Sequence, residues 1–373
     1  MTQYLFIFGA VLLSMICGIV SIPIIIRFCK EKGLYDLPNS RKVHHNAIPR
    51  LGGISFIPSM TLASLIVFLV HNQILVGNQL HISLWTVGFF FSLFLIYGVG
   101  IVDDLVGLGA KTKFSMQIIA SMVMPICGLY INDLYGFCGI HEVPFWFGAI
   151  FTLYIVVFIS NSINLIDGID GLSGGLSLIA LTGFLTLFIR RGDMTAYCIM
   201  IAGLMGVLVA FIYFNLFGNP EKNHKIFMGD SGSLTLGYVL GFLAVKSTMN
   251  DERMEYDPSV MMYAFSLIIV PVFDVVRISY VRLRQHAPIF LADKNHIHHK
   301  LMRMGLTQHQ TLTTILLLAV AFIAVNHLLW YVCDFTFIVL IDIVLWNLFH
   351  IVINHRIRKQ GKLVYVREEK KNG

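Results

Sequence analysis

A polar stretch interrupts one of the most apolar parts of the chain: Asn161-Ser162-Ile163-Asn164-Leu165-Ile166-Asp167-Gly168-Ile169-Asp170-Gly171. It follows a long apolar run, at the point where a membrane helix would leave the bilayer. Residues i and i+3 of a helix share a face, so the Asn161 and Asn164 side chains are expected to point the same way. Glycines follow Asp167 and Asp170 and allow the backbone to turn. Polar groups here are costly unless they bind something, which predicts a ligand site at a membrane surface.

The composition around this stretch excludes an ordinary soluble domain. The 373 residues are 57% hydrophobic and only 13% charged, with a mean hydropathy of +0.76, whereas soluble proteins average about 25% charged residues. The apolar segments are about 20 residues long, which suits helices, while a β-barrel would show alternating segments of about 10 residues. We therefore predict an all-α integral membrane protein that forms a single polytopic bundle.

Apolar runs separated by polar breaks predict about eleven transmembrane helices. The first begins without a basic segment or a small-residue cleavage site, so it is interpreted as a span and not as a cleavable signal peptide. The six cysteines are scattered without a CxxC pair, which argues against a zinc site or a disulfide framework. The predicted spans are 4–26, 51–70, 84–102, 114–131, 144–163, 173–189, 196–214, 232–247, 259–280, 311–331 and 335–354.

The distribution of basic residues predicts the orientation of these spans. With the loop 27–50 in the cytoplasm, 23 of the 27 Lys and Arg residues fall on the inner side. The N-terminus is then outside and the C-terminus cytoplasmic. We expect one transmembrane catalytic domain over 1–355, with active-site loops at 27–50, 103–113, 161–172, 215–231 and 281–310. The basic cytoplasmic tail 356–373 is expected to contact anionic headgroups.

Two further acidic motifs fall on the inner side. Asp103 and Asp104 end the third span, and adjacent helical residues diverge by about 100°, so the two are not expected to do the same job. The alternative interpretation is that the two carboxylates have no binding or catalytic role and only end the helix in solvent. Asp230 opens the eighth span between two glycines, either as a simple N-cap or as a metal-binding carboxylate beside backbone N–H groups that face an anion.

Basic residues accompany the acidic ones. Lys111 and Lys113 open the fourth span, either as ordinary membrane anchors or, for Lys113 above all, facing the carboxylates and a phosphate. The segment Asp293–His299 follows the ninth span, and its imidazoles are expected to contact phosphate more readily than a transition metal, because a phosphate-bound cation prefers oxygen ligands. Asp274 and Arg277 are expected to form an ion pair within the ninth span. The imidazoles of the segment Asp293–His299 are those of His296, His298 and His299. The remaining candidates for phosphate or substrate binding are Arg282, Arg284, His44, His45 and Arg50.

The inner side therefore gathers five carboxylates, which is costly without a counter-charge. Carboxylate and amide oxygens suit Mg²⁺, which keeps waters and also takes substrate phosphates. Acidic metal ligands, basic phosphate contacts and a membrane-facing site indicate phosphoryl transfer to or from a lipid. A transporter is the competing class, but its polar groups would lie near the bilayer midplane, often with inverted repeats, and no repeat is visible. A non-catalytic scaffold or sensor is disfavoured because the complete acidic and basic set would have no role.

These motifs resemble the polyprenyl-phosphate N-acetylhexosamine-1-phosphate transferases of glycosyltransferase family 4. The resemblance rests on Asp103-Asp104, Asn161–Gly171, Phe227–Asp230 and Asp293–His299, and it covers nearly the whole chain. The pattern Asn-x-x-Asn-x-x-Asp-Gly-x-Asp-Gly-Leu is highly specific, whereas Asp-Asp alone is not. The segment His296-Ile297-His298-His299 looks like the GlcNAc-1-phosphate branch, since the peptidoglycan-precursor branch carries three consecutive histidines.

The resemblance implies a reaction and a set of residue roles. The lipid phosphate of undecaprenyl phosphate attacks the β-phosphorus of a UDP-sugar, UDP-GlcNAc being favoured, and UMP leaves. UDP-MurNAc-pentapeptide and modified UDP-N-acetyl sugars are the alternative donors. Asp230 and Asn164 are assigned to Mg²⁺, with Mn²⁺ as an alternative metal. Asp103, with Asp104 beside it, deprotonates the lipid phosphate or orients Lys113, while Asp167 and Asp170 position the nucleotide or a metal-bound water.

The same resemblance implies the setting of the enzyme. It is expected in the bacterial inner membrane, with its site on the cytoplasmic face and with membrane lipids as neighbours. Asn161 and Lys111 join the substrate-binding set. A homodimer is allowed by analogy, and no nucleic-acid partner is expected.

Overall fold

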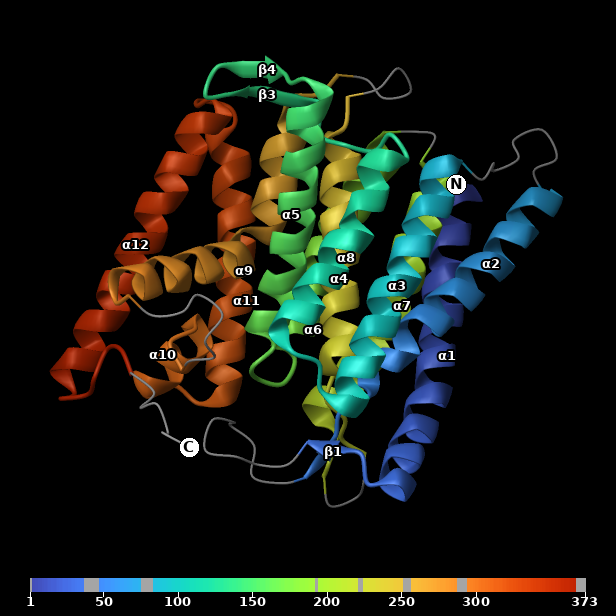
Figure 1. Ribbon diagram of the computed structural model, residues 1–373, viewed down its shortest axis with the longest axis horizontal. Coiled ribbons are helices and arrows are strands. Elements are labelled where there is room, and N and C mark those ends of the chain that lie inside the picture. Colours follow the sequence, from blue (N-terminus) through green and yellow to red (C-terminus); the bar gives the residue numbers. More distant parts are fainter. Residues whose placement is uncertain are drawn as a thin grey trace.

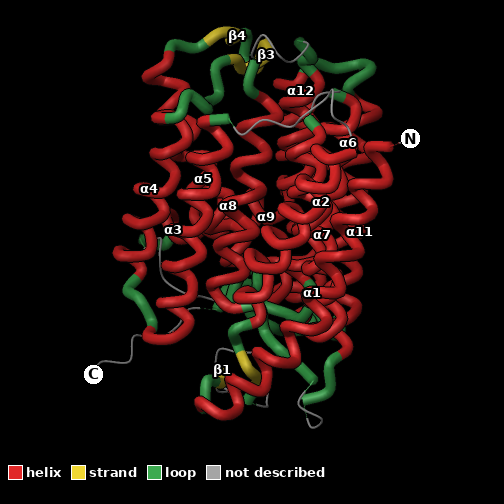
Figure 2. The backbone as a smooth tube through the Cα atoms, turned by 90° about the vertical axis from the view of Figure 1, so that its right-hand side faces the viewer, coloured by secondary structure: helices red, strands yellow, loops and turns green. Residues whose placement is uncertain are grey.

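The computed structural model describes residues 2–36, 47–74, 83–191, 194–220, 224–250, 256–286 and 294–366. Within these residues the chain forms twelve α-helices and two small hairpins. Most of the helices run along a common direction in one bundle, and the start of α1 (Thr2–Lys32) and the end of α12 (Phe335–Lys359) lie at opposite ends of it (Figures 1 and 2).

Each of the eleven predicted spans overlaps one long helix, so the predicted all-α polytopic fold is confirmed. The additional helix, α10, lies inside the segment 281–310 that was expected to be a loop. The helices are α1 (Thr2–Lys32), α2 (Phe56–Ile74), α3 (Leu84–Val106), α4 (Ala110–Ile126), α5 (Phe145–Ile166), α6 (Leu172–Arg190), α7 (Thr195–Phe217), α8 (Gly229–Thr248), α9 (Ser259–Arg284), α10 (Ile297–Arg303), α11 (Gln308–Leu329) and α12 (Phe335–Lys359).

Nine of the described helices are both long and apolar enough to cross a membrane. Of the eleven long helices, α4 and α8 are not among the nine. The helix α4 has only 17 residues. Every residue of α8 from Ser231 to Thr248 is buried, because α3, α5 and other helices surround it (Figure 1). A helix enclosed by protein does not face lipid, so it tolerates the Ser, Thr and Gly residues that a lipid-facing helix of this length would not.

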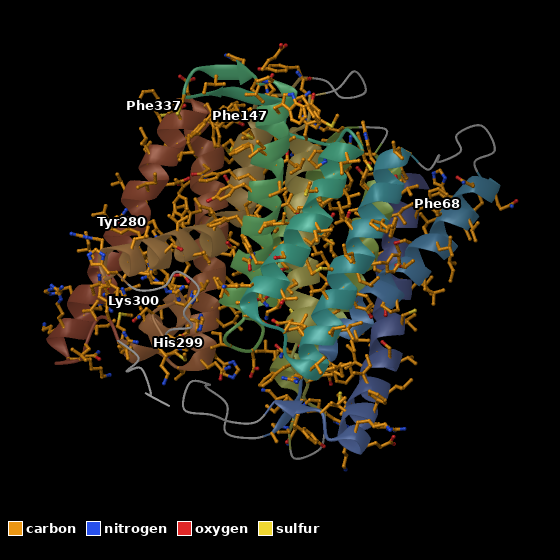
Figure 3. The ribbon with its side chains drawn as sticks, in the orientation of Figure 1. Phe68, Phe147, Tyr280, His299, Lys300 and Phe337 are labelled. Atoms are coloured by element: carbon orange, nitrogen blue, oxygen red, sulfur yellow. The ribbon has the colours of Figure 1, made fainter. Side chains whose placement is uncertain are left out.

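The helix α9 changes direction along its length. Its N-terminal part runs along the bundle, whereas its C-terminal part lies across the other helices and carries Tyr280 toward the periphery (Figures 1 and 3). Pro271 lies inside this helix, and an internal proline removes one backbone hydrogen bond and kinks the helix. The bend directs the end of α9 toward the segment that carries the histidines.

The two hairpins lie at opposite ends of the bundle. β3 (Asp133–Phe137) pairs with β4 (Ile140–Glu142) at one end, and β1 (Tyr35–Asp36) pairs with β2 (Ile48–Pro49) at the other, with Tyr35 opposite Pro49 (Figure 1). The backbone after β2 continues into contact with the segment before α8. Phe227 N–H donates to Pro49 O at 2.7 Å, and Gly52 N–H donates to Phe227 O at 2.9 Å. This pairing, followed by the 3₁₀-helix Gly52–Ser55, places Arg50 next to the start of α8.

Candidate active site

The acidic motifs meet where α3 ends and where α4 and α8 begin. Lys113 lies between two carboxylates, with its Nζ 2.9 Å from Asp103 Oδ2 and 2.9 Å from Asp230 Oδ2. Asp103 also accepts a hydrogen bond from the Leu108 backbone N–H at 2.6 Å. The loop from α3 to α4 spans only residues 107–109, and this short connection holds Lys113 beside the carboxylate that precedes it. The prediction that Lys113 faces the carboxylates is therefore confirmed.

Asp104 has a different role from its neighbour, as the sequence predicted. Its carboxylate accepts hydrogen bonds from the backbone N–H groups of Asp230 at 2.8 Å and of Ser231 at 2.9 Å. The first N–H groups of a helix lack hydrogen-bond acceptors within the helix and carry partial positive charge. A buried carboxylate supplies both the missing acceptor and a compensating negative charge. Asp104 thus caps α8 from another helix. The Asp230 side chain does not act as a simple N-cap, because it faces Lys113 and Asn164.

The two amides of the opening stretch contact neighbouring helices. Asn164 donates its Nδ2 to Asp230 Oδ1 and to Ser233 Oγ, the latter at 2.8 Å. Its carbonyl oxygen is therefore the atom that it can offer to a cation. Asn161 donates to Gln117 Oε1 on α4 at 2.5 Å and to the Val157 carbonyl at 2.8 Å. Asn164 thus contacts the acidic site directly, and Asn161 fixes α5 against α4.

The acidic loop between α5 and α6 lies at the same end of the bundle. Gly171 has φ = 76°, a left-handed conformation that favours glycine, so the predicted turn occurs there. Asp170 pairs with Lys225 Nζ at 2.6 Å. Asp167 has an exposed side chain, which leaves it accessible to a ligand. The surrounding protein, together with the negative charges of Asp230, Asp170 and Asp104, raises the pKa of Asp167 above its usual range.

The predicted ion pair in α9 is confirmed, and it also holds the histidine segment. Asp274 is fully buried and accepts from Arg277 Nη2 at 2.7 Å. The Ile297 backbone N–H donates to the same oxygen, Oδ1, at 3.1 Å, and the other oxygen, Oδ2, lies 2.8 Å from His296 Nδ1. Arg277 also donates to the Asn295 carbonyl at 2.6 Å. The ion pair therefore anchors the start of α10.

The three histidines occupy different environments. His296 is engaged by Asp274, as described above. His298 is 1% exposed, and it lies so close to Gly168 that an added Cβ there would be 2.2 Å from its Nε2. Gly168 is thus required by close approach and not by a turn. His299 is half-buried, with its ring centroid 4.2 Å from that of His298, and its side chain is displayed in Figure 3. His299 is the histidine most open to a ligand, and phosphate contact by the three stays a prediction.

The other predicted substrate-binding residues are more dispersed. Lys111 is exposed on the first turn of α4, and Arg50 is half-buried beside the start of α8. Arg282 is buried in the last turn of α9, whereas exposed Arg284 lies over the Tyr280 ring at 5.6 Å. His44 and His45 lie outside the described residues. Their roles in substrate binding stay predictions.

Several residues that position the site were absent from the predicted set. Gln117 and Ser233 hold the two amides, and Lys225 neutralises Asp170. Asn215 is buried and bridges two segments, accepting from the Gly171 N–H at 2.7 Å and donating to the Ile226 carbonyl at 2.9 Å. Asn215 and Lys225 fall within the predicted active-site loop 215–231. Gln117 gave a weaker signal, as a single amide within an apolar helix.

The donor set fits an oxygen-preferring cation. Within the described residues, no three His, Cys, Asp or Glu side chains form a preformed metal cluster. Mg²⁺ does not need one, because it is usually held by one or two carboxylates together with substrate phosphates and waters. Asp230, the carbonyl oxygen of Asn164 and the exposed carboxylate of Asp167 supply such a partial set. The Lys113 ammonium offsets part of their negative charge.

Comparison with known proteins identifies the family of the chain. The model of glycosyl transferase family 4 matches residues 86–248, which include the Asp-Asp, amide and Asp230 motifs. The undecaprenyl-phosphate alpha-N-acetylglucosaminyl 1-phosphate transferase of Yersinia pestis is 32% identical, over 77% of this chain and 74% of its own length. The probable undecaprenyl-phosphate N-acetylglucosaminyl 1-phosphate transferase of Bacillus subtilis (strain 168) is 30% identical, over 84% and 82%. An Escherichia coli (strain K12) protein with the same name as the Yersinia protein is 30% identical, over 82% and 79%. The chain belongs to glycosyl transferase family 4.

Proposed function

We propose that this protein transfers N-acetylglucosamine 1-phosphate from UDP-GlcNAc to undecaprenyl phosphate. A phosphate oxygen of the lipid attacks the β-phosphorus of the donor, the bond between that phosphorus and the bridging oxygen breaks, and UMP leaves. The product is undecaprenyl-diphosphate-GlcNAc, the first lipid-linked intermediate of an envelope polysaccharide. The observation that carries the proposal is the Lys113 bridge between Asp103 and Asp230 at one end of a membrane bundle, in a chain whose relatives carry out this transfer by name.

The residues of the site have separate proposed tasks. Lys113 and His299 hold phosphate oxygens, because they combine positive charge or N–H donors with partial exposure. Asp167 and Asp170 position the nucleotide, and Asp170 is itself oriented by Lys225. Asp104 holds the N-terminus of α8, which keeps Asp230 at a fixed place. Preorganised charge of this kind accounts for most of the catalysis in phosphoryl transfer, where positioning and electrostatic stabilisation dominate.

Asp103 is proposed to orient Lys113 and not to remove a proton. The second pKa of a phosphate monoester lies near ~6, so the attacking lipid phosphate is mostly ionised at neutral pH. A general base therefore has little to gain. The direct contact between the Asp103 carboxylate and Lys113 supports the orienting role.

We propose Mg²⁺ as the cofactor, with Mn²⁺ as a substitute. Asp230 and Asn164 would hold it, with Asp167 near enough in the same acidic cluster to take part. When bound, the cation offsets the charge that develops on the pyrophosphate oxygens. The charges of the chain itself support this assignment, because the five carboxylates of the site outnumber Lys113 and Lys225, the lysines that pair with them among the described residues.

The proposed location is a bacterial plasma membrane, with the site on the cytoplasmic face. The support is the excess of Lys and Arg in the loops at the end of the bundle that carries the site. UDP-sugars are made in the cytoplasm, so this orientation also gives the donor access.

A donor panel tests the proposal. Purified protein is mixed with undecaprenyl phosphate, Mg²⁺ and one UDP-sugar at a time, and UMP release is measured. We expect release with UDP-GlcNAc and little with UDP-MurNAc-pentapeptide. If only another UDP-N-acetyl sugar supports release, the reaction class stands and the donor changes. If no donor supports release, the transferase proposal fails.

A further inference from the structure

A cavity of about 530 Å³ lies away from the acidic cluster, between the end of α10, the start of α11 and the end of α12. Its lining combines two cations, two amides and apolar groups: Met304, Gly305, Leu306, Gln310, Arg356, Lys359 and Gln360. The volume is large enough for a phospholipid headgroup. The cations Arg356 and Lys359 are exposed, and neither forms an ion pair or a side-chain hydrogen bond with any described residue.

The cavity continues a lipid-facing stripe on α12. Leu348 and Val352 are more than half exposed, and Arg356 and Lys359 follow Val352 at i+4 and i+7. These positions share one face of a helix. Apolar side chains that end in two cations at the edge of the bundle match a lipid whose acyl chains contact the apolar part and whose phosphate contacts the cations.

The neighbouring helix presents the same pattern. On α11, Leu317 and Val320 are largely exposed, and Gln310 stands seven residues before Leu317 on the same face. The helices α11 and α12 contact each other, and the start of α11 and the end of α12 both line the cavity. The amide of Gln310 and the positive N-terminal end of α11 add further favourable contacts for an anion.

We propose that this cavity binds the headgroup of an anionic glycerophospholipid, such as phosphatidylglycerol. The phosphate diester lies between Arg356 and Lys359, and the acyl chains lie along the exposed apolar residues of α11 and α12. None of the acidic-site residues lines this cavity, so the proposal does not depend on the transfer reaction.

A bound lipid would also support the histidine segment. Gln360 donates to the Met304 carbonyl at 2.7 Å, and Lys362 donates to the Arg303 carbonyl at 3.0 Å. Both bonds tie the end of α12 to the end of α10, the helix that carries His298 and His299. Occupancy of the cavity therefore stabilises the contact between these two helix ends.

Native mass spectrometry of the purified full chain measures the affinity for the first added lipid. We expect phosphatidylglycerol to bind the wild-type protein more tightly than phosphatidylcholine. The double substitution Arg356→Gln/Lys359→Gln should weaken phosphatidylglycerol binding on the order of thirtyfold, since each cation near a membrane surface contributes about fivefold. The matched control Arg358→Gln/Lys30→Gln removes the same charges from exposed positions outside the cavity and should bind as the wild type does.

A second variant tests the cavity without removing a cation. Gln310→Glu preserves the capping box in which Gln310 accepts from the Thr307 N–H at 2.9 Å, and it adds one negative charge to the lining. It should also weaken phosphatidylglycerol binding. Unchanged binding in both the double variant and Gln310→Glu would overturn the proposal. Displacement of phosphatidylglycerol by inorganic phosphate would identify a free-anion site, and one-for-one displacement by undecaprenyl phosphate would identify an acceptor site; either result would also overturn it.

Discussion

At the scale of single residues, neighbouring side chains of one type serve different purposes. Asp103 pairs with Lys113, whereas Asp104 caps α8 through two backbone N–H groups. Their separation follows from the 100° rotation between adjacent helical positions. The tertiary structure supplies the two partners, one on α4 and the other at the start of α8.

Substituting each aspartate separately should reveal this difference. Asp104→Asn places an NH₂ group against backbone N–H donors and should lower the stability by about 2 kcal/mol, as is typical for a lost hydrogen bond to a charged group. Asp103→Asn should leave the melting temperature close to that of the wild type and lower turnover at every pH. Thermal unfolding and UMP release measure the two effects. Recovery of Asp103→Asn activity above the pKa of the lipid phosphate would instead support a general base.

Lys300 provides a prediction about pH. It is fully buried in α10, where its Nζ contacts Asn354 Oδ1. Burial and the positive charge of Arg277 lower the pKa of Lys300 to about 7, from an ordinary value of 10.5. Below pH 7 the folded and unfolded states are both protonated, so the cost of burying the charge is fully present. Between these two pKa values the unfolded state binds more protons, so stability rises with pH.

Lys300→Met removes the titrating group and should be more stable than the wild type at pH 7. That advantage should shrink by about 2 kcal/mol between pH 7 and pH 9, as the wild type loses the buried charge. Melting temperatures at the two pH values measure the change, and Lys30→Met, at an exposed position, should show no such trend. An advantage that is constant with pH would contradict the pKa assignment.

At the scale of elements, the site is built from helix ends. The short loop 107–109 joins α3 to α4, the acidic loop joins α5 to α6, and α10 lies against that loop through His298 and Gly168. The kink at Pro271 lets Asp274 and Arg277 reach the start of α10. The geometry of the site therefore depends on how these ends contact one another.

Gly168→Ala tests the contact between the acidic loop and α10. The new methyl group would overlap the buried His298 ring, so the loop or α10 must shift, at a typical cost of about 1 to 3 kcal/mol for overpacking. We expect a large loss of UMP release from protein that still folds. The control is Gly98→Ala in α3, where a Cβ meets no atom within 4 Å. Full activity in Gly168→Ala would show that this contact does not position the site.

At the scale of the whole molecule, the two hairpins mark opposite ends of the bundle (Figure 1). Reporter fusions test the proposed orientation. Green fluorescent protein fused after the last residue should fluoresce, because it folds in the cytoplasm. Alkaline phosphatase fused after Glu142, at the end of β4, should be active because it is exported. The reverse pattern would place the site on the outer face and contradict the proposed access to UDP-sugars.

The sequence by itself determined the helical class, the span positions and most of the site's residue types. Local signals suffice for these, because bilayer thickness sets the length of apolar runs and polar groups within such runs are costly. It also predicted that Asp103 and Asp104 would differ and that Asp274 would pair with Arg277, since both follow from helical periodicity.

Only the tertiary structure decided which partners these residues meet. The cap that Asp104 provides to α8 joins residues more than 120 positions apart, and no local pattern records such a contact. The need for glycine at position 168 comes from a histidine 130 residues later in the chain. The composition of the stretch Asn161–Gly171 thus predicted a site. The geometry of that site was determined by the packing of α3, α4, α8 and α10 around the stretch, because it depends on contacts between segments that are distant in the sequence.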